Sequence, residues 1–237
     1  MAKTDEALIL AGGFGTRLQS VVRDVPKPLA PVGGRPFIAW LLDALAAQGM
    51  RRMVLAVGYM GEVVEQALGS SWRGAALIYS REPEPLGTGG AVSLAAGCIQ
   101  GDSFFLLNGD TWLELDYGAF DRAAVTASAP LSMALARVED VSRYGAVRVE
   151  DNRVAGFVEK GSSGAGHINA GVYRVTRDML GSFPDKHRFS FENEVLAPAV
   201  EQGLVSAFTQ TRGFIDIGIP ADYARAATVL PTAEDAV

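Results

Sequence analysis

The stretch LILAGGFGTRLQSVVRDVPKPLAP, residues 8–31, joins an apolar strand to a glycine-rich turn and to two cations, Arg17 and Lys27. Glycines in a turn adopt backbone angles closed to other residues and let a ligand approach main-chain N–H groups closely. A strand that runs into such a turn predicts an α/β fold that binds phosphate, and the two cations favour the same interpretation. On the glycines alone, a merely tight connection between a strand and a helix remains the alternative.

The turn matches neither of two common phosphate loops. No Lys-Ser/Thr pair follows Gly15, as a Walker loop requires, and the G-x-G-x-x-G spacing of dinucleotide folds is absent. Pro26 and Pro28 flank Lys27 and predict a stiff, extended segment that cannot continue a helix. Such a segment would hold the ammonium group of Lys27 in place, whereas the alternative is a solvated surface lysine.

The composition limits the class of protein. The chain has 237 residues, is 49% hydrophobic and carries a net charge of −6. These values predict one α/β domain or two closely joined lobes, and they argue against a nucleic-acid or anionic-membrane surface. Cys98 is the only cysteine, which excludes an internal disulfide and a cysteine-built zinc site. Because there is no leader pattern and no apolar stretch long enough to span a bilayer, we expect a cytoplasmic protein.

Hydrophobic periodicity divides the chain into two parts. The first part predicts an α/β fold, a Rossmann-like, mostly parallel (mixed) sheet flanked by helices. From about residue 131, short strands and tight turns predict an antiparallel second half. The expected strands are 7–11, 52–57, 76–79, 103–108, 132–138, 145–149, 153–159 and 169–174. The expected helices are 36–48, 61–68, 89–98, 191–202 and 221–229.

Two aspartates stand out downstream of the glycine turn. Asp110 follows the buried strand expected at 103–108, and parallel sheets bind ligands beyond the carboxyl ends of their strands. The glycine turn and Asp110 should therefore meet in one crevice, where Asp110 could bind Mg²⁺, although capping of the next turn is the alternative. Asp216 alternates with Ile215 and Ile217, so it either faces solvent or is held in a site.

Weaker candidates stand at other element ends. Residues 85–90, PLGTGG, offer small side chains where a flat base could enter, but a simple helix-entry loop is the alternative. Residues 159–160 and 169–171 place polar groups at strand ends, where binding residues tend to collect. Taken singly, they fit surface positions better than a binding site. His167 and His187 have no ligand spacing around them and receive no role.

The ordered set of motifs over residues 7–227 resembles that of the sugar-1-phosphate nucleotidyltransferases. Within that family, residues 24–37 are most similar to the D-glycero-α-D-manno-heptose 1-phosphate guanylyltransferases. The motifs are Leu10-Ala11-Gly12-Gly13-x-Gly15-Thr16-Arg17-Leu18, Pro26-Lys27-Pro28, Leu86-Gly87-Thr88, Asn108-Gly109-Asp110, Glu159-Lys160, Asn169-Ala170-Gly171 and Asp216-x-Gly218.

The resemblance implies a role for each matching residue. Arg17, on the triphosphate, and Lys27, on the α-phosphate, would be the catalytic residues, and Asp110 and Asp216 would bind Mg²⁺. The nucleotide would be bound by Leu10, Ala11, Gly12, Gly13, Gly15, Thr16, Gly87 and Thr88. The sugar phosphate would be bound by Asn108, Gly109, Tyr144, Gly145, Glu159, Lys160, Asn169 and Gly171.

The resemblance also implies a fold and a reaction. The fold would be the nucleotidyltransferase (GT-A-like) fold, a single domain over 1–230 with a nucleotide-binding part at about 1–130, a sugar-phosphate-binding part at about 131–230 and a tail at 231–237. The enzyme would transfer GMP from GTP to D-glycero-α-D-manno-heptose 1-phosphate and release pyrophosphate. The GDP-heptose would serve capsule, S-layer or other surface polysaccharide synthesis. Homo-oligomers occur in the family, but no interface can be identified.

Three alternatives remain open at this point. One keeps the fold and changes the substrates, as in a uridylyl- or thymidylyltransferase acting on N-acetylmuramate or a hexose 1-phosphate. Another is an inactive regulatory homologue that binds a nucleotide sugar, against which the presence of Arg17, Lys27, Asp110 and Asp216 argues. The third is a glycosyltransferase of similar topology, but such enzymes usually carry Asp-x-Asp where this chain has Asn108-Gly109-Asp110.

Overall fold

The computed structural model describes residues 3–13, 18, 22, 25–158, 161 and 163–231. Five predicted site residues lie outside this part of the chain, and nothing is inferred about their positions. They are Gly15, Thr16, Arg17, Glu159 and Lys160.

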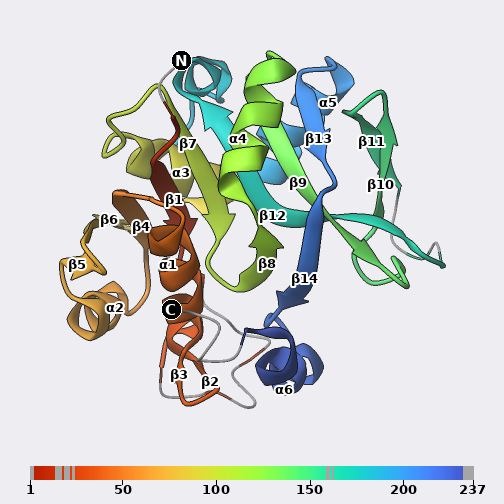
Figure 1. Ribbon diagram of the computed structural model, residues 1–237. Helices are drawn as coiled ribbons and strands as arrows, with labels where there is room; N and C mark the ends of the chain where they lie inside the picture. The colour runs from red at the N-terminus through yellow and green to blue at the C-terminus, as the bar shows by residue number, and fades with distance from the viewer. Residues whose placement is uncertain are drawn as a thin grey trace.

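One ten-stranded mixed sheet runs through the molecule, with helices on both faces (Figure 1). The strand order is β10-β11-β13-β9-β12-β7-β1-β4-β6-β5. Its strands are β1 (Glu6–Leu10), β4 (Arg52–Val57), β5 (Ser71–Trp72), β6 (Ala75–Arg81), β7 (Ser103–Asn108), β9 (Leu131–Val138), β10 (Ala146–Glu150), β11 (Arg153–Val158), β12 (Gly166–Thr176) and β13 (Val205–Phe208).

Two small sheets and several helices complete the fold. The small sheets pair β2 (Pro31–Val32) with β3 (Arg35–Pro36), and β8 (Thr111–Leu115) with β14 (Thr211–Asp216). The α-helices are α1 (Phe37–Ala47), α2 (Gly61–Leu68), α3 (Gly87–Ala96), α4 (Tyr117–Thr126), α5 (Ala197–Glu201) and α6 (Pro220–Val229). Single-turn or short helices of other types are the 3-10 helices Lys27–Leu29 and Arg177–Ser182 and the π-helix Glu192–Leu196.

The predicted parallel core is confirmed. Strands β7, β1, β4 and β6 pair in parallel, and nearly all residues of β1, β4 and β7 are buried because helices cover both faces. Alternate residues of β1 belong to different cores: Ile9 packs with α1 and α4, whereas Leu8 packs with α3 and α5. The prediction of a helix at 36–48 is also confirmed, and Gly49 follows it at φ +89.

The second half is only partly antiparallel, which corrects the prediction. Strands β9, β12, β10 and β11 pair antiparallel as expected, but β13 lies parallel to β9. The reason is the helical connection between β12 and β13, which carries the chain across the sheet and returns it on the other side of β9. Hydrophobic periodicity indicates that a strand is present, but it does not indicate which neighbouring strand it pairs with.

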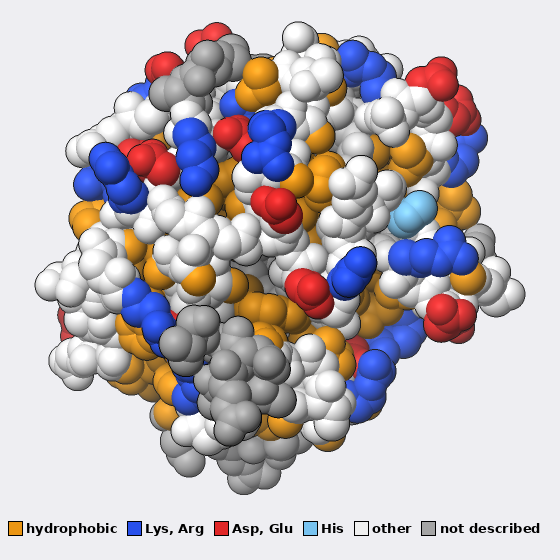
Figure 2. All heavy atoms as spheres, in the orientation of Figure 1, with side chains coloured by type: hydrophobic (Ala, Val, Ile, Leu, Met, Phe, Trp, Pro, Cys, Tyr) orange, Lys and Arg blue, Asp and Glu red, His pale blue; other side chains and the backbone are white. Residues whose placement is uncertain are grey.

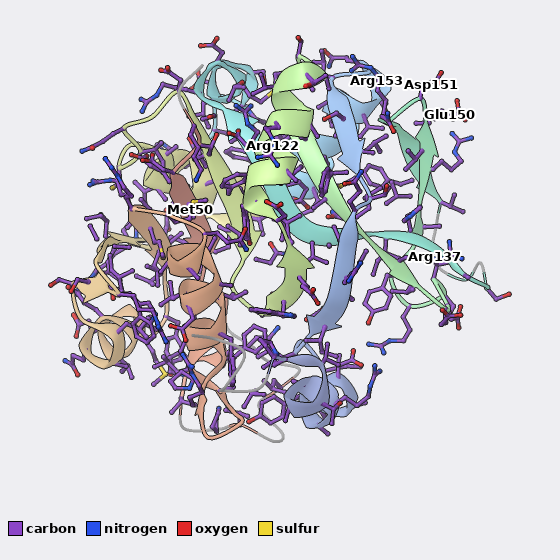
Figure 3. All side chains as sticks on the ribbon, viewed as in Figure 1. Met50, Arg122, Arg137, Glu150, Asp151 and Arg153 are labelled. Atoms are coloured by element: carbon purple, nitrogen blue, oxygen red, sulfur yellow. The ribbon has the colours of Figure 1, made fainter. Side chains whose placement is uncertain are left out.

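Residues 150–152 form one of the tight turns expected in the second half, as a two-residue hairpin loop between β10 and β11. Asp151 and Asn152 have φ values of +51 and +58, the combination that a type I′ turn needs. Figure 3 shows Glu150, Asp151 and Arg153 at the outer edge of the molecule, far along the sheet from β1. The turn therefore closes the edge hairpin and lies away from the parallel strands.

The face drawn in Figure 2 mixes basic and acidic side chains, and the described helices are short. On the face drawn in Figure 2, basic and acidic side chains are interspersed, without a continuous basic field among the coloured atoms. No helix in the described part of the chain is both long enough and apolar enough to cross a membrane.

A buried polar network ties the beginning of the chain to β7, α4 and β12. Asp121 accepts hydrogen bonds from Arg174 Nε at 2.8 Å and from Thr4 Oγ1 at 2.7 Å. Arg174 also donates to Ser103 Oγ at 3.1 Å. Burial alone would raise the pKa of Asp121, but the hydrogen bonds from Thr4 and Arg174 outweigh it and hold that pKa below its usual value.

We expect Asp121→Ala to lower the free energy of unfolding by about 3–5 kcal/mol, because the Arg174 side chain, 3% exposed, would lose its counter-ion. Since the folded pKa is depressed, the contribution of Asp121 is complete above the unfolded pKa and is lost as the pH falls through the folded pKa. Urea titrations at neutral and acid pH measure both effects. Equal losses in Asp121→Ala and in the exposed control Asp178→Ala would contradict the expectation.

Candidate active site

Three segments far apart in the sequence meet at the carboxyl ends of the parallel strands. Gly12, which follows β1, approaches the main chain after β4 so closely that a Cβ atom on it would lie 2.8 Å from Gly58 N. Gly109, which follows β7, donates its N–H to Leu10 O at 2.9 Å, and a Cβ there would lie 2.6 Å from the same oxygen. Only glycine fits at either position, so the two turns form one continuous wall.

This wall encloses a cavity of about 630 Å³. The predicted site residues that line it are Leu10, Ala11, Gly12, Gly13, Lys27, Gly87, Thr88, Asn108, Gly109 and Asp110. The remaining lining residues are Pro28, Gly58, Tyr59, Glu82, Pro83, Glu84, Pro85, Ala91 and Glu192. A volume of this size accommodates a ligand as large as a nucleotide.

Lys27 contacts Asp110 on this wall. The ammonium group donates a hydrogen bond to Asp110 Oδ2, and the Lys27 side chain is only 11% exposed. The extended segment expected around Lys27 is corrected in part: Pro26 is extended, but Lys27 begins a 3-10 turn, closed by Ala30 N–H donating to Lys27 O at 3.0 Å. Pro28 tolerates this turn because the first N–H groups of a helix have no partner within it.

Asp216 reaches the same place from the opposite end of the chain. Strand β14 pairs with β8 so that Asp216 lies opposite Thr111, and Ile217 N–H donates to Asp110 O at 3.0 Å. A Cβ atom on Gly218 would lie 2.8 Å from Asp216 Oδ1 and 3.2 Å from Lys27 Nζ, so the Asp216 carboxylate and the Lys27 ammonium group are neighbours. Asp216 therefore lies beside Lys27 at the edge of the cavity, although it is not one of the residues that line it.

The two carboxylates fit a magnesium site in their chemistry. Asp110 and Asp216 offer hard oxygen donors at the ends of paired strands, and Lys27 is the cation between them. No group of three or more His, Cys, Asp or Glu residues suited to a metal occurs among the described residues. Mg²⁺ does not need one, because it takes one or two carboxylates and completes its shell with water and phosphate oxygens.

Two of the predicted sugar-phosphate residues, Asn169 and Gly171, lie beside the cavity, whereas Asn108 and Gly109 line it. In β12 a bulge places Gly171 at φ +68, and a Cβ atom there would lie 2.5 Å from Asn108 Nδ2. Asn169 accepts the N–H of Gly171 at 2.9 Å and donates to Tyr173 Oη at 2.6 Å. Asn169 and Gly171 thus adjoin the end of β7 but do not line the cavity itself.

Tyr144 and Gly145 lie farther from the cavity, in the turn between β9 and β10. Gly145 adopts φ +82, and the Tyr144 ring meets the Phe214 ring edge to face, with centroids 5.6 Å apart. Phe214 is on β14, two residues before Asp216. Tyr144 is therefore connected to the Asp216 side of the site, and the remaining predicted residues lie outside the described part of the chain.

The glycine run at residues 87–90 serves packing more than ligand access. Helix α3 begins at Gly87, two residues earlier than predicted. Cβ atoms on Gly89 and Gly90 would lie 2.2 Å from Phe189 Cδ2 and from His187 O, so neither glycine leaves space for a base. The Thr88 hydroxyl is also used internally, because it donates to Glu192 Oε2 at 2.6 Å.

Sequence reasoning missed Glu82 and Glu192. Glu82 follows β6, at the carboxyl end of a parallel strand, so the rule that identified Asp110 could have identified it as well. Burial raises the pKa of Glu82, although a hydrogen bond from Leu86 N–H at 3.0 Å opposes the shift. Glu192 comes from the π-helix, and no local signal in the sequence places it at the cavity.

Comparison with known proteins identifies a matching family and several similar proteins. The model of the family described as "Nucleotidyl transferase" matches residues 6–232. D-glycero-α-D-manno-heptose 1-phosphate guanylyltransferases of Aneurinibacillus thermoaerophilus and Campylobacter jejuni are 38% and 37% identical to the chain. The alignments cover 93% and 92% of this chain and 96% of each relative.

Solved structures agree with these matches. HddC from Yersinia pseudotuberculosis, crystallised with GMP-PN, superposes with a TM-score of 0.84 at 38% identity and covers 95% of this chain and 99% of its own. A putative glucose-1-phosphate thymidylyltransferase from Bacillus anthracis has a TM-score of 0.81 at 21% identity, covering 95% and 94% of the two chains. The second likeness concerns the fold alone.

Proposed function

The chain belongs to the nucleotidyl transferase family, and on that premise we propose that it transfers GMP from GTP to D-glycero-α-D-manno-heptose 1-phosphate. The reaction takes place in the cytoplasm and releases pyrophosphate. The product, GDP-heptose, is used for the synthesis of surface polysaccharide. The observation that carries the proposal is the contact of Lys27 with Asp110 on the wall of the glycine-lined cavity. GTP occupies the part of the domain formed by about residues 1–130, and the sugar phosphate occupies the part formed by about 131–230.

The proposed reaction needs no protein nucleophile. A phosphate oxygen of the sugar 1-phosphate attacks the α-phosphorus of GTP in line, the bond to the β-phosphate oxygen breaks, and pyrophosphate leaves. Because both reactants are anions, the protein has to align them and neutralise their mutual repulsion. Lys27 is held at the cavity wall by a nearly buried stem, so its ammonium group meets the charge that develops on the α-phosphate without a large rearrangement.

Asp110 and Asp216 would hold Mg²⁺ at the same point. When bound, the ion supplies charge neutralisation at the phosphate oxygens. Without ligands, Lys27 pairs with Asp110, so the acids and the ammonium group are kept close together before the substrates arrive. At Gly13 in the turn after β1, a Cβ atom would meet nothing within 4 Å, so this part of the main chain has room for a phosphate to approach.

Glu82 accounts for the choice of guanine in this proposal. Its Oε1 atom lies 2.8 Å from the position of a Cβ on Gly12, inside the cavity wall. Guanine carries N1–H and N2–H donors side by side, and a carboxylate accepts both. Uracil and thymine present one N–H between two carbonyl oxygens. A carboxylate repels these carbonyl oxygens, because both groups carry negative charge and neither can donate a hydrogen bond. Leu86 N–H occupies only one of the acceptor positions of Glu82.

We expect Glu82→Gln to raise the KM for GTP by about 5- to 150-fold, the effect of losing one bidentate base contact. The KM for UTP should change little or fall, because an amide can donate to a carbonyl oxygen. Initial rates of pyrophosphate release with each nucleotide measure this ratio. Glu201→Gln on the exposed side of α5 is the matched control and should behave as the wild type. An unchanged preference for GTP in Glu82→Gln would remove Glu82 from base selection.

The function itself is tested by a substrate matrix. The protein is incubated with Mg²⁺, each of the common nucleoside triphosphates and a panel of sugar 1-phosphates, and pyrophosphate is measured. Release with GTP and the heptose 1-phosphate alone supports the proposal. Release with UTP or dTTP and a hexose 1-phosphate would replace it with the uridylyl- or thymidylyltransferase alternative. No release with any pair would favour a nucleotide-sugar-binding homologue, and release without sugar phosphate would indicate a nucleotide hydrolase.

A further inference from the structure

Asp222 is a buried carboxylate that none of the site motifs includes. It lies in the first turn of α6, and its side chain is only 2% exposed. Arg143 donates to both of its oxygens, from Nη2 to Oδ2 at 2.5 Å and from Nη1 to Oδ1 at 3.3 Å. Tyr144 Oη lies 3.5 Å from Oδ2, and Arg225 Nη1 lies 3.4 Å from Oδ1. A charge so thoroughly buried has to be paired, which the two arginines achieve.

These contacts join two segments on either side of the Asp216 strand end. Helix α6 begins at Pro220, four residues after Asp216, so Asp222 is close along the chain to the end of β14. Arg143 and Tyr144 belong to the turn between β9 and β10, where Tyr144 N–H and Gly145 N–H both donate to Val141 O at 3.0 Å. The position of this turn relative to Asp216 therefore depends on the Asp222 carboxylate, together with the packing of Tyr144 on Phe214.

The cluster lies in the electrostatic field of the proposed metal-binding acid. The hydrogen bond to Asp222 is the main cause that raises the pKa of Arg143, and the charge of Asp216 contributes to the same shift. Burial, and then the charges of Asp222 and Asp216, raise the pKa of Tyr144. At neutral pH the phenol therefore keeps its proton and can donate a hydrogen bond, and the guanidinium stacks on its ring at 5.1 Å.

Arg143 keeps capacity for another partner. A guanidinium has five N–H donors, and the side chain is 47% exposed although two of its nitrogens bond Asp222. Because Asp222 fixes the guanidinium plane, the remaining donors are presented with little loss of side-chain freedom when an anion or a sugar hydroxyl arrives.

We propose that Asp222 is a positioning residue for the sugar 1-phosphate, acting through Arg143 and Tyr144, which it holds beside the Asp216 end of β14. This inference rests on the proposed function, and it extends that function to a carboxylate that contacts neither substrate. The sugar phosphate then binds to hydrogen-bond donors of Arg143 and Tyr144, and Asp222 on α6 fixes the orientation of these side chains.

Steady-state kinetics of Asp222→Asn test the proposal. We expect the KM for the sugar 1-phosphate to rise about 10- to 100-fold, the range found when a hydrogen-bond partner that orients a metal ligand is removed. The KM for GTP should stay at the wild-type value, because the nucleotide cavity does not include α6 or the turn at residues 141–145. Arg143→Ala tests the same contact from its half-exposed side, where folding is less at risk.

A double-mutant cycle separates positioning from simple stabilisation. If Asp222 acts largely through Arg143, the rise in the KM for the sugar phosphate in the double variant Asp222→Asn/Arg143→Ala should be clearly smaller than the product of the two single effects, because only the part that acts through Tyr144 remains to be lost. Arg225→Ala, which removes the exposed partner of Asp222 on the same helix, is the control and should leave both KM values unchanged. Wild-type KM values in Asp222→Asn would overturn the inference, as would equal rises for both substrates with additive effects in the double variant. Absence of pyrophosphate release by the wild type with every substrate pair would instead overturn the proposed function, and the inference with it.

Discussion

Replacing Lys27 with alanine is expected to reduce kcat by about 100- to 1,000-fold, the range found when one preorganised donor to a transition-state charge is removed. The ammonium group is held at the cavity wall against Asp110 by a side chain that is only 11% exposed. In the proposed reaction it would therefore meet the α-phosphate charge in a fixed place. Because that charge grows in the transition state, the loss should appear mainly in kcat, and binding of GTP should weaken much less.

Pyrophosphate release and calorimetric binding of GTP measure the two effects separately. The protein should remain folded, because Asp110 is one-third exposed and water can solvate it when its partner is removed. Lys3→Ala, at an exposed position near the beginning of the chain, is the control for a lost positive charge. Full turnover in Lys27→Ala would refute the assignment of this lysine. If Lys27→Ala reduced the affinity for GTP by as large a factor as it reduced kcat, Lys27 would be assigned to ground-state binding instead.

Replacing Asp110 with asparagine is expected to abolish turnover that depends on Mg²⁺, with a loss of at least about 1,000-fold. Asparagine keeps one oxygen and the shape of the side chain, but it lacks the charge that a hard divalent cation requires. Asp216→Asn should have a similar effect because the two acids flank the same lysine. When residues act as a unit, the double variant should be little worse than either single variant.

The measurement is pyrophosphate release as a function of Mg²⁺ concentration, with thermal unfolding as the check on folding. Asp116→Asn is the matched control: Asp116 caps α4 by accepting Ala119 N–H at 2.8 Å, and asparagine caps helices equally well. Wild-type turnover after complete removal of divalent cations by a chelator would contradict the metal assignment. Loss of activity in Asp116→Asn would show that charge removal near β8 is harmful by itself.

Local patterns predicted the central strands of the parallel half of the fold, but they missed helix α4 (Tyr117–Thr126), which none of the expected helices covers. Buried apolar runs with flanking glycines predicted β4 and β7 with the bounds that the structure has, and the same reasoning placed Asp110 and the glycine turn at one sheet edge. The physical reason is that parallel strands are covered on both faces, so their continuous apolar runs are visible in the sequence. Strand β8, exposed at Glu114 and next to a tight turn, has no such run and was missed.

What the sequence by itself determined is a strand, a glycine turn, a lysine between prolines and an acid after a buried strand, each a property of a few neighbouring residues. Only the tertiary structure decided that Asp216 lies beside Lys27, that Glu192 lines the cavity, and that Asp222 ties α6 to the turn at residues 141–145. These contacts depend on the pairing of β8 with β14, about a hundred residues apart, and on how helices pack. Which strands pair and which helices pack together depends on the whole core, because the free energy of one pairing depends on every other contact formed with it.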